Sequence, residues 1–162
     1  MPPEAALAEL ANLLETAPTV GVGLSAAAPT IARLVPFDRL TFVLFEPDGT
    51  RMAVRWLAEG GATTWVDDDH RQPLAIAGAP AEWVRATGQT LHERDTLASR
   101  FPHHPVRAAG RRSFLLVPLG APTIGVLGWS MVAPGGYPEE AIATAERIAA
   151  LISARLGAGP SG

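Results

Sequence analysis

The sequence predicts a mixed α/β (α+β) domain built on an antiparallel sheet. Three features support this fold class: helical patterns at both ends of the chain, a strand-turn-strand pattern after the first helices, and a long uncharged tract near the C-terminus. The uncharged tract, residues 113–138, is long enough to raise the question of a membrane helix, which needs roughly 20 apolar residues. Pro118, Gly120 and Pro122 interrupt it and would leave backbone groups unpaired in lipid. We therefore predict two strands here.

The first part of the chain has the apolar periodicity of helices. Apolar residues recur at helical spacing within residues 3–16, which predicts an amphipathic helix whose apolar stripe needs a partner. Residues 17–36 continue with a weaker helical pattern that contains several glycines. Pro29 lies inside this second segment, and we expect it to kink or restart the helix.

A hairpin follows the helices. Residues 40–46 and 52–58 are rich in apolar and aromatic residues, and the turn-forming sequence Pro-Asp-Gly-Thr at residues 47–50 separates them. This pattern predicts two antiparallel strands. Residues 59–72 are polar and predict a loop.

The middle of the chain combines a short helix with a short strand. Residues 79–87 predict a helix ending at Gly88, because glycine tolerates the left-handed conformation found after helices. Residues 89–92 predict a short strand, and the polar residues 95–106 predict a connecting segment.

The two strands of the uncharged tract precede a long terminal helix. The strands are predicted at residues 113–119 and 123–131, joined by a short turn. Because successive residues such as Phe114 and Leu115 are both apolar, both faces of these strands must be covered. Residues 138–156 predict the helix, with acidic residues in its first turn and Arg in its last.

Several stretches together resemble a GAF domain, a family of small sensory α/β modules. Arg-Ser-Phe-Leu-Leu-Val-Pro-Leu at residues 112–119, Ile-Gly-Val-Leu at 124–127 and Pro-Glu-Glu at 138–140 resemble the closing half of that fold. Residues 36–49 look like the family's first hairpin, and Trp-Val-Arg-Ala-Thr-Gly-Gln-Thr-Leu at 83–91 is similar to its cross-helix and inner strand. The resemblance covers nearly the whole chain. The turn after residue 119 is shorter than the Gly-rich connection of many members.

The resemblance implies one domain over residues 1–162. We expect N-terminal helices at 1–36, a sheet with a pocket-covering insert at 37–136, a C-terminal helix at 137–156 and a flexible tail at 157–162. The sheet should have five or six strands, with the terminal helices on one face and short helices and loops on the other.

Composition limits the expected cellular compartment and the classes of binding partner. The net charge is −3, which gives no basic surface for nucleic acid, and the chain contains no Cys. The N-terminus lacks the basic region of a secretory signal. We therefore expect a cytoplasmic protein that binds neither nucleic acid nor membrane.

In GAF proteins a small ligand lies between the sheet and a short helix with its neighbouring loop. That placement implies a cover formed by Trp83 and residues 101–106, over strands that carry the pocket floor. Which face of each strand lines the pocket stays open, because a shift of one residue reverses it. The ligand itself is not predicted. The candidate ligand-binding residues are Phe42, Trp56, Trp83, His92, Phe101, Ser113, Leu115 and Trp129.

Two polar clusters have alternative interpretations. Asp67-Asp68-Asp69 with His70 could ligate a metal, but the run lacks the Gly and distant Glu of a calcium loop, and a solvated loop is the simpler interpretation. His103-His104 could face one site, as some GAF relatives hold haem or iron through a His, but no haem motif is present. Exposed or locally bonded imidazoles are the simpler interpretation there, and we predict no metal site.

We predict no enzymatic activity. Bilin attachment and free methionine sulfoxide reduction in the family need Cys, and the cyclic-nucleotide subset carries an Asn-Lys and Asp signature, whereas this chain has neither Cys nor Lys. Ser25 and Ser130 lack the flanking glycines of a nucleophile elbow.

The predicted function is a sensory or regulatory module that binds a small molecule and signals through its terminal helices. The alternative is a ligand-free dimerisation or interaction scaffold whose pocket is filled by its own Trp and Phe side chains. A PAS-like sensor is a third possibility on fold alone.

We expect a homodimer in which helices near Leu10 and Ile148 pack against the same helices of a second copy. The output partner, a kinase or transcription regulator, should be a separate chain unless this chain is a piece of a longer one.

Overall fold

The computed structural model describes residues 3–157. The rest of the predicted tail, residues 158–162, lies outside the described residues. Along the described part the elements are α1 (Pro3–Thr16), α2 (Val20–Leu34), β1 (Arg39–Phe45), β2 (Arg51–Glu59), β3 (Ala62–Trp65), β4 (Leu74–Ala75), α3 (Pro80–Thr87), β5 (Leu91–Glu93), the 3-10 helix η1 (Thr96–Ala98), α4 (Pro105–Ala108), β6 (Ser113–Leu119), β7 (Gly125–Met131) and α5 (Glu139–Gly157).

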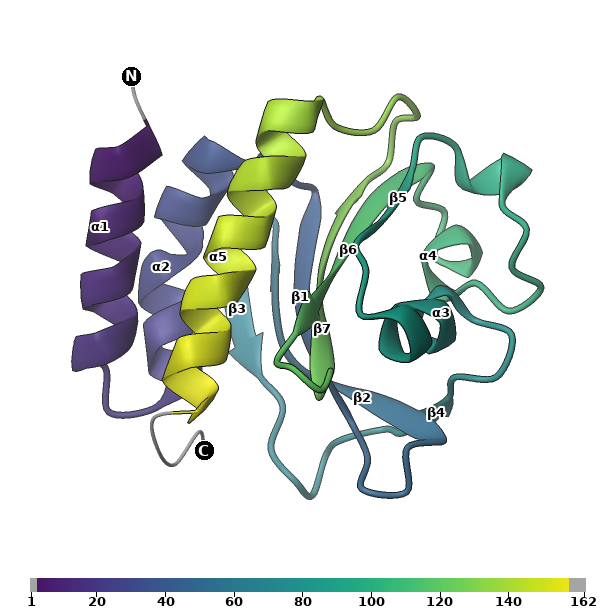
Figure 1. Ribbon diagram of the computed structural model, residues 1–162, viewed down its shortest axis with the longest axis horizontal. Helices are drawn as coiled ribbons and strands as arrows, with labels where there is room; N and C mark the ends of the chain where they lie inside the picture. The colour runs from purple at the N-terminus through teal and green to yellow at the C-terminus, as the bar shows by residue number, and fades with distance from the viewer. Residues whose placement is uncertain (1–2, 158–162) are drawn as a thin grey trace.

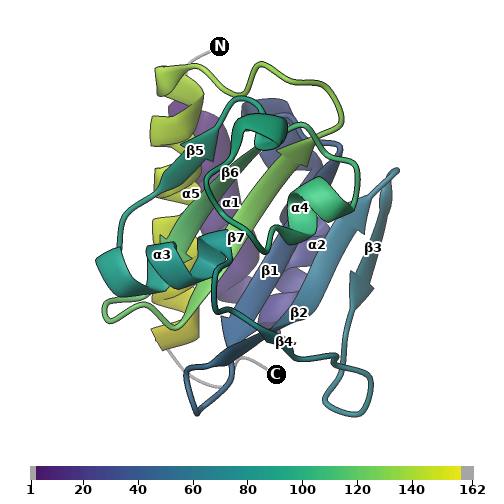
Figure 2. The ribbon, with the colours of Figure 1, turned by 90° about the vertical axis from the view of Figure 1, so that its right-hand side faces the viewer.

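The strands form one antiparallel sheet between two layers of helices. The strand order is β3-β2-β1-β7-β6-β5, and β4 pairs with the start of β2. Helices α1, α2 and α5 cover one face, and the shorter α3 and α4 lie over the other (Figures 1 and 2). This arrangement confirms the predicted α+β fold class.

The uncharged tract forms the centre of the sheet, as predicted. Every residue of β6 and β7 is buried except Pro118 and Met131, which are half-buried. Alternate β6 residues enter different cores: Leu115 and Val117 join the cluster beneath the terminal helices, whereas Phe114 and Leu116 join the cluster beneath α3. The same two strands therefore link both layers of the molecule.

Three local predictions are corrected. Residues 59–72 are not all loop, because residues 62–65 form β3 against β2. The last strand starts at Gly125, so Thr123 and Ile124 belong to the turn. Pro29 does not restart a helix: α2 continues through it, and packing of neighbours such as Ala28 and Ile31 in the core compensates for the missing hydrogen bond.

Close approach of α2 to β3 explains a glycine in that helix. A Cβ on Gly21 would lie 2.7 Å from the ring of Trp65, so only glycine leaves room for the indole. Trp65 also stacks on Phe42, with ring centroids 6.4 Å apart. Packing with distant residues, rather than local alternation, therefore stabilises the short strand β3.

The terminal helices use their main apolar stripes inside the protomer. Leu10 and Ile148 are both fully buried in the core beneath α1, α2 and α5. These two positions are not free to contact a second copy, so a dimer would have to use other faces of the helices. Across residues 3–157, no helix combines the length and apolar character needed to cross a bilayer.

Candidate ligand-binding cavity

A cavity of about 410 Å³ lies between the sheet and the layer formed by α3 and α4. Its floor comes from β1, β2, β6 and β7, one side comes from residues 66–74, and its roof comes from α3, α4 and the residues that follow α4. The lining residues are Arg39, Thr41, Val43, Met52, Val54, Leu57, Val66, His70, Gln72, Leu74, Pro80, Ala81, Pro105, Val106, Ala109, Arg111, Phe114, Leu116, Val126, Gly128, Trp129 and Ser130.

A β-bulge decides which residues of β2 face the cavity. Phe42 of β1 pairs with Trp56, but Val43 pairs with Val54, so Arg55 is an extra residue in the ladder. Past the bulge, the side chains of β2 alternate between the two faces of the sheet in the opposite phase. Val54 and Leu57 therefore both line the cavity, while Trp56 lies in the opposite core. Arg55 itself donates from Nε to the Val66 carbonyl (3.2 Å), which anchors the side of the cavity.

The roof is held to β5 by a buried hydrogen-bond chain. His104 begins α4, where its Nδ1 accepts from the Arg107 N–H (3.2 Å). Its Nε2 therefore carries the proton and donates to Glu93 Oε1 of β5 (2.7 Å). Ser99 Oγ donates to the other oxygen of Glu93 (2.7 Å). The His104 side chain is fully buried and packs edge-on against Phe114, so the roof is tied to the cavity wall.

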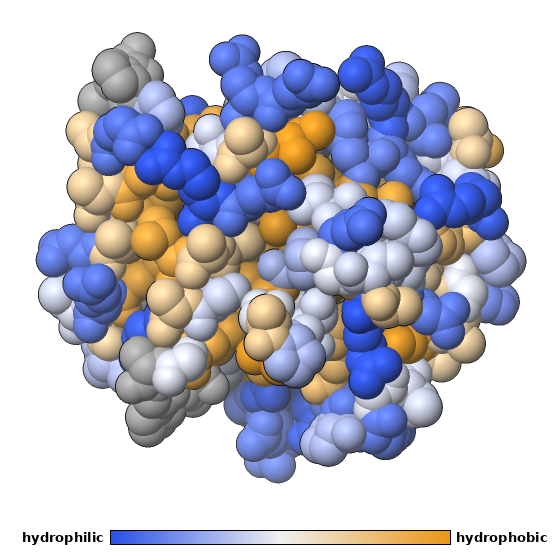
Figure 3. Space-filling model, viewed as in Figure 1, coloured by the Kyte–Doolittle hydropathy of each residue, from blue (hydrophilic) through white to orange (hydrophobic). Residues whose placement is uncertain are grey.

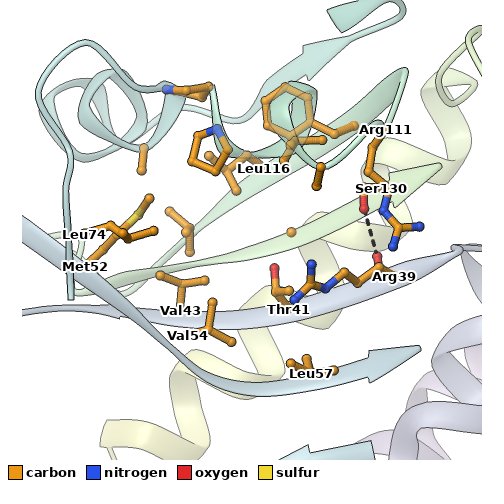
Figure 4. Close-up of a pocket in the computed structure, with 18 of the residues that line it drawn as sticks. Arg39, Thr41, Val43, Met52, Val54, Leu57, Leu74, Arg111, Leu116 and Ser130 are labelled. Carbon is orange, nitrogen blue, oxygen red and sulfur yellow. Dashed lines mark hydrogen bonds between the residues drawn. The ribbon is translucent and has the colours of Figure 1, made fainter. Parts of the chain in front are cut away.

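The cavity has an apolar end and a cationic end (Figure 4). Met52 and Leu74 lie at one end, and Arg39, Arg111 and Ser130 lie at the other, with Val43 and Val54 between them. The Nε atoms of Arg39 and Arg111 are both buried without a hydrogen-bond partner among residues 3–157. An apolar cavity with a few convergent polar groups is the usual form of a small-molecule site.

Comparison with known families identifies the fold. The profile of the GAF domain family matches residues 24–156. The chain belongs to the GAF family. No curated protein sequence matches this GAF domain. The resemblance noted in the sequence is therefore confirmed for most of the chain.

Solved structures with the same fold have varied roles. The chain resembles a free methionine-R-sulfoxide reductase from Neisseria meningitidis, solved with its substrate, with a TM-score of 0.76 at 15% identity over 95% of this chain and 87% of that chain. It resembles the GAF domain of a phosphoenolpyruvate-protein phosphotransferase from Coxiella burnetii with a TM-score of 0.76 at 14% identity, covering 95% and 92%. It also resembles the chromophore-binding domain of a bacteriophytochrome from R. palustris, with a TM-score of 0.73 at 15% identity, covering 95% and 61%. Identities this low show a shared fold alone.

The candidate residues of this GAF domain separate onto the two faces of the sheet. Phe42, Trp56 and Leu115 lie in the core beneath the terminal helices and do not line the cavity. The strand face of these residues was left open by the sequence, and the structure places their side chains on the helix side. Trp129 borders the cavity, but its side chain belongs to the same helix-side core. The Trp56 indole donates to Ser25 Oγ of α2 (3.0 Å), which is a structural contact.

The other four candidates do not line the cavity. Trp83 and Phe101 belong to the apolar cluster on the cavity side, and the Arg100 guanidinium lies over both rings. Ser113 Oγ donates to the Ala133 carbonyl (2.9 Å), and His92 accepts from the Tyr137 N–H (2.9 Å). The ligand-binding role of these residues stays a prediction.

Sequence reasoning missed the two arginines. A basic residue at the end of a strand is usually solvated, so nothing about Arg39 or Arg111 alone indicated a site. The available signal was the alternation of Arg39 with Thr41 and Val43, which places all three on one face of β1. The pairing of β1 with β7 then brings that face beside Ser130.

The acidic run and the histidine pair make local contacts. His70 Nδ1 lies 2.6 Å from Asp67 Oδ1, and this hydrogen bond lowers the pKa of Asp67. Asp68 pairs with Arg55 (2.7 Å). His103 is exposed while His104 is buried, so the pair does not face one site. Among residues 3–157, no three His, Asp or Glu side chains gather in a metal-binding group.

Proposed function

We propose that this GAF domain is a non-enzymatic sensory module that binds one small molecule in the cavity and passes the signal to its terminal helices. The observation that supports the proposal is the cavity itself, which lies between the sheet and a separate roof. A ligand would favour one packing of the roof over the sheet and shift the population toward it.

Strand β6 supplies a direct path from the cavity to α5. Phe114 and Leu116 line the cavity, and the intervening Leu115 packs in the core with α5 residues such as Ile148 and Ile152. At the end of β6, the Gly120 N–H donates to Ser153 Oγ of α5 (3.0 Å). A displacement of β6 by a ligand would therefore reach α5 through packed side chains.

A second path runs from the roof to the same helix. Helix α3 ends at Gly88, whose φ of 64° is the left-handed cap predicted from the sequence. Two residues later, Thr90 Oγ1 donates to Glu146 Oε2 of α5 (2.7 Å). Movement of α3 over a ligand would act on this contact.

The lining chemistry supports binding rather than catalysis. The cavity walls are mainly aliphatic, and the sequence has no Cys to act as a nucleophile. Of the histidines, only His70 borders the cavity, and its side chain is 79% exposed and hydrogen-bonded to Asp67.

The large aromatic side chains leave the cavity unfilled. Phe114 is the aromatic ring that faces the cavity, whereas Trp56 and Trp129 pack in the opposite core. This favours a binding domain over a scaffold whose pocket is filled by its own rings.

We further propose that the outer faces of α1 and α5 form the output surface and hold a second copy of the chain. Apolar side chains gather over these helices in Figure 3. Leu13, Ile142, Leu151 and Leu156 remain only partly buried there. Such residues suit a helix-to-helix dimer interface.

A neutral apolar dye tests ligand binding directly. N-phenyl-1-naphthylamine should bind with a saturable rise in fluorescence, because its apolar rings match the cavity walls. Val54→Trp should abolish binding by filling the cavity, whereas Val22→Trp, at an exposed site on α2, should not. Circular dichroism would verify that both variants fold. Equal dye binding by the two folded variants, or no saturable binding by the wild type, would refute the proposal.

A further inference from the structure

We propose that the occupant of the cavity is a monocarboxylate with an apolar body, held at its carboxylate by Arg39 and Arg111. This inference rests on the proposed function, because it assigns the chemical class of the ligand in the same cavity. It comes from the polarised lining seen in Figure 4, with aliphatic side chains at one end and guanidinium groups at the other.

The Arg39 guanidinium forms no ion pair or hydrogen bond with the described part of the chain. The side chain extends from the start of β1 over the sheet toward Thr41 (Figure 4). No acidic group among residues 3–157 forms an ion pair with it, and its Nε is buried without an acceptor. Buried N–H groups almost always have an acceptor, so an orphaned one facing a cavity indicates a ligand that supplies it. A guanidinium group presents paired donors that fit a carboxylate.

Arg111 supplies a second donor, and a nearby carboxylate limits the total charge. Its side chain is only 13% exposed and its Nη2 pairs with Glu59 Oε2, while its Nε has no acceptor in the described part of the chain. Glu59 is also the cross-strand neighbour of Arg39. Two guanidinium groups and one carboxylate leave about one positive charge at this end of the cavity. One negative charge on the ligand would neutralise it, which favours a carboxylate over a dianionic phosphate.

The remainder of the cavity requires an apolar ligand body. Val43, Val54 and Leu116 surround its middle, and Met52 and Leu74 close the far end. These side chains offer no hydrogen bond to a polar ligand, so polar groups placed there would lose their water without compensation. Thr41, near the arginines, supplies a hydroxyl group at the end where the carboxylate would lie, whereas Ser130 Oγ donates to the Arg39 carbonyl (3.5 Å).

Competition against the neutral dye separates this inference from the proposed function. Protein loaded with N-phenyl-1-naphthylamine would be titrated with 4-phenylbutyrate, with its uncharged amide 4-phenylbutanamide, and with phenyl phosphate. The carboxylate should displace the dye at about tenfold lower concentration than the amide, since charge-assisted hydrogen bonds are stronger than neutral ones. It should also compete better than the phosphate.

Charge variants assign this preference to the cationic end of the site. Arg39→Gln should weaken carboxylate competition about tenfold and leave amide competition unchanged. Arg39→Lys should weaken carboxylate competition less than Arg39→Gln does, because lysine keeps the positive charge but lacks the paired N–H donors of a guanidinium group. Glu59→Gln should strengthen carboxylate binding several-fold by removing the competing negative charge. Arg33→Gln, which makes the same charge change on α2, serves as the matched control and should have no effect.

The outcomes are distinct. Equal competition by carboxylate and amide, stronger competition by phenyl phosphate, or an unchanged preference in Arg39→Gln would overturn the carboxylate inference while leaving dye binding intact. Failure of the dye to bind would overturn the proposed function and this inference together. Arg39→Gln should fold normally, because its side chain has no hydrogen bond to the residues that the structure describes and so none would be lost.

Discussion

The hydrogen bond that His92 forms with Tyr137 depends on the protonation state of the imidazole. Its Nε2 accepts a hydrogen bond from the Tyr137 N–H (2.9 Å), which requires the neutral imidazole. Burial, and to a lesser degree the charge of Arg94, lowers the pKa of His92 below its usual 6.5. The contact ties β5 to the segment that leads into α5, so protonation would loosen this link between the sheet and that segment.

The direction of the pH effect follows from that lowered pKa. Below pH 6.5 the unfolded chain binds a proton at His92 more readily than the folded chain, so this contribution to stability is full above pH 6.5 and is lost as the pH falls toward the lowered pKa. In His92→Gln, which retains an acceptor but does not titrate, the free energy of unfolding should fall less between pH 7.5 and 5. Urea unfolding at several pH values measures this. Identical pH profiles for the two proteins would contradict the assignment.

At the residue scale, the sequence could not reveal which face of a strand each side chain occupies. Strict alternation along residues 52–58 would place Val54 and Trp56 together, but the bulge at Arg55 separates them. A bulge depends on pairing with β1 and on contacts to the Val66 carbonyl, which are long-range. The same limitation hid the cationic end of the cavity, because Arg39 and Arg111 meet only after the sheet forms.

At the scale of elements, strong periodicity predicted most of the structure. Helix α1 has the predicted bounds, and α3 with its Gly88 cap and strand β6 also follow the sequence closely. The strand β3 was not predictable, since its polar residues lack alternation and its anchor, Trp65, packs on α2 and β1. Local signals were sufficient where an element carried its own apolar pattern.

Helix α2 offers a direct test of this balance between local and tertiary effects. Pro29 is exposed in the helix interior and cannot donate to the Ser25 carbonyl. Pro29→Ala should raise the free energy of unfolding by roughly 1–3 kcal/mol, because it restores that hydrogen bond and changes no buried packing. Chemical denaturation measures the change. Pro36→Ala, also exposed but outside the helix, should not stabilise the protein; a Pro29→Ala variant that is no more stable than wild type would contradict the account.

At the scale of the whole molecule, the predicted dimer can be tested on the outer surface of α1 and α5. Light scattering should give about twice the chain mass of 17.0 kDa at micromolar concentration. Ala154→Arg should produce monomers, because Ala154 lies in a surface groove between these helices and is exposed in the protomer. Ala108→Arg, at an exposed position on α4, should leave the mass unchanged. A monomeric wild-type protein would exclude this part of the proposal.

The overall architecture gives the cavity and the terminal helices a shared set of strands. Helix α5 packs on one face of β6, and the opposite face of β6 and β7 forms part of the cavity floor. Sequence resemblance to the family anticipated this layering, although it could not supply the chemistry of the cavity. Occupancy of the cavity should therefore change α5.

Hydrogen-deuterium exchange with the cavity empty and saturated with N-phenyl-1-naphthylamine measures that change directly. We predict slower exchange in β6 and α3, which border the ligand, together with a clear change in α5, which does not touch it. Protection confined to the cavity segments, with exchange in α5 unchanged at saturation, would contradict the account.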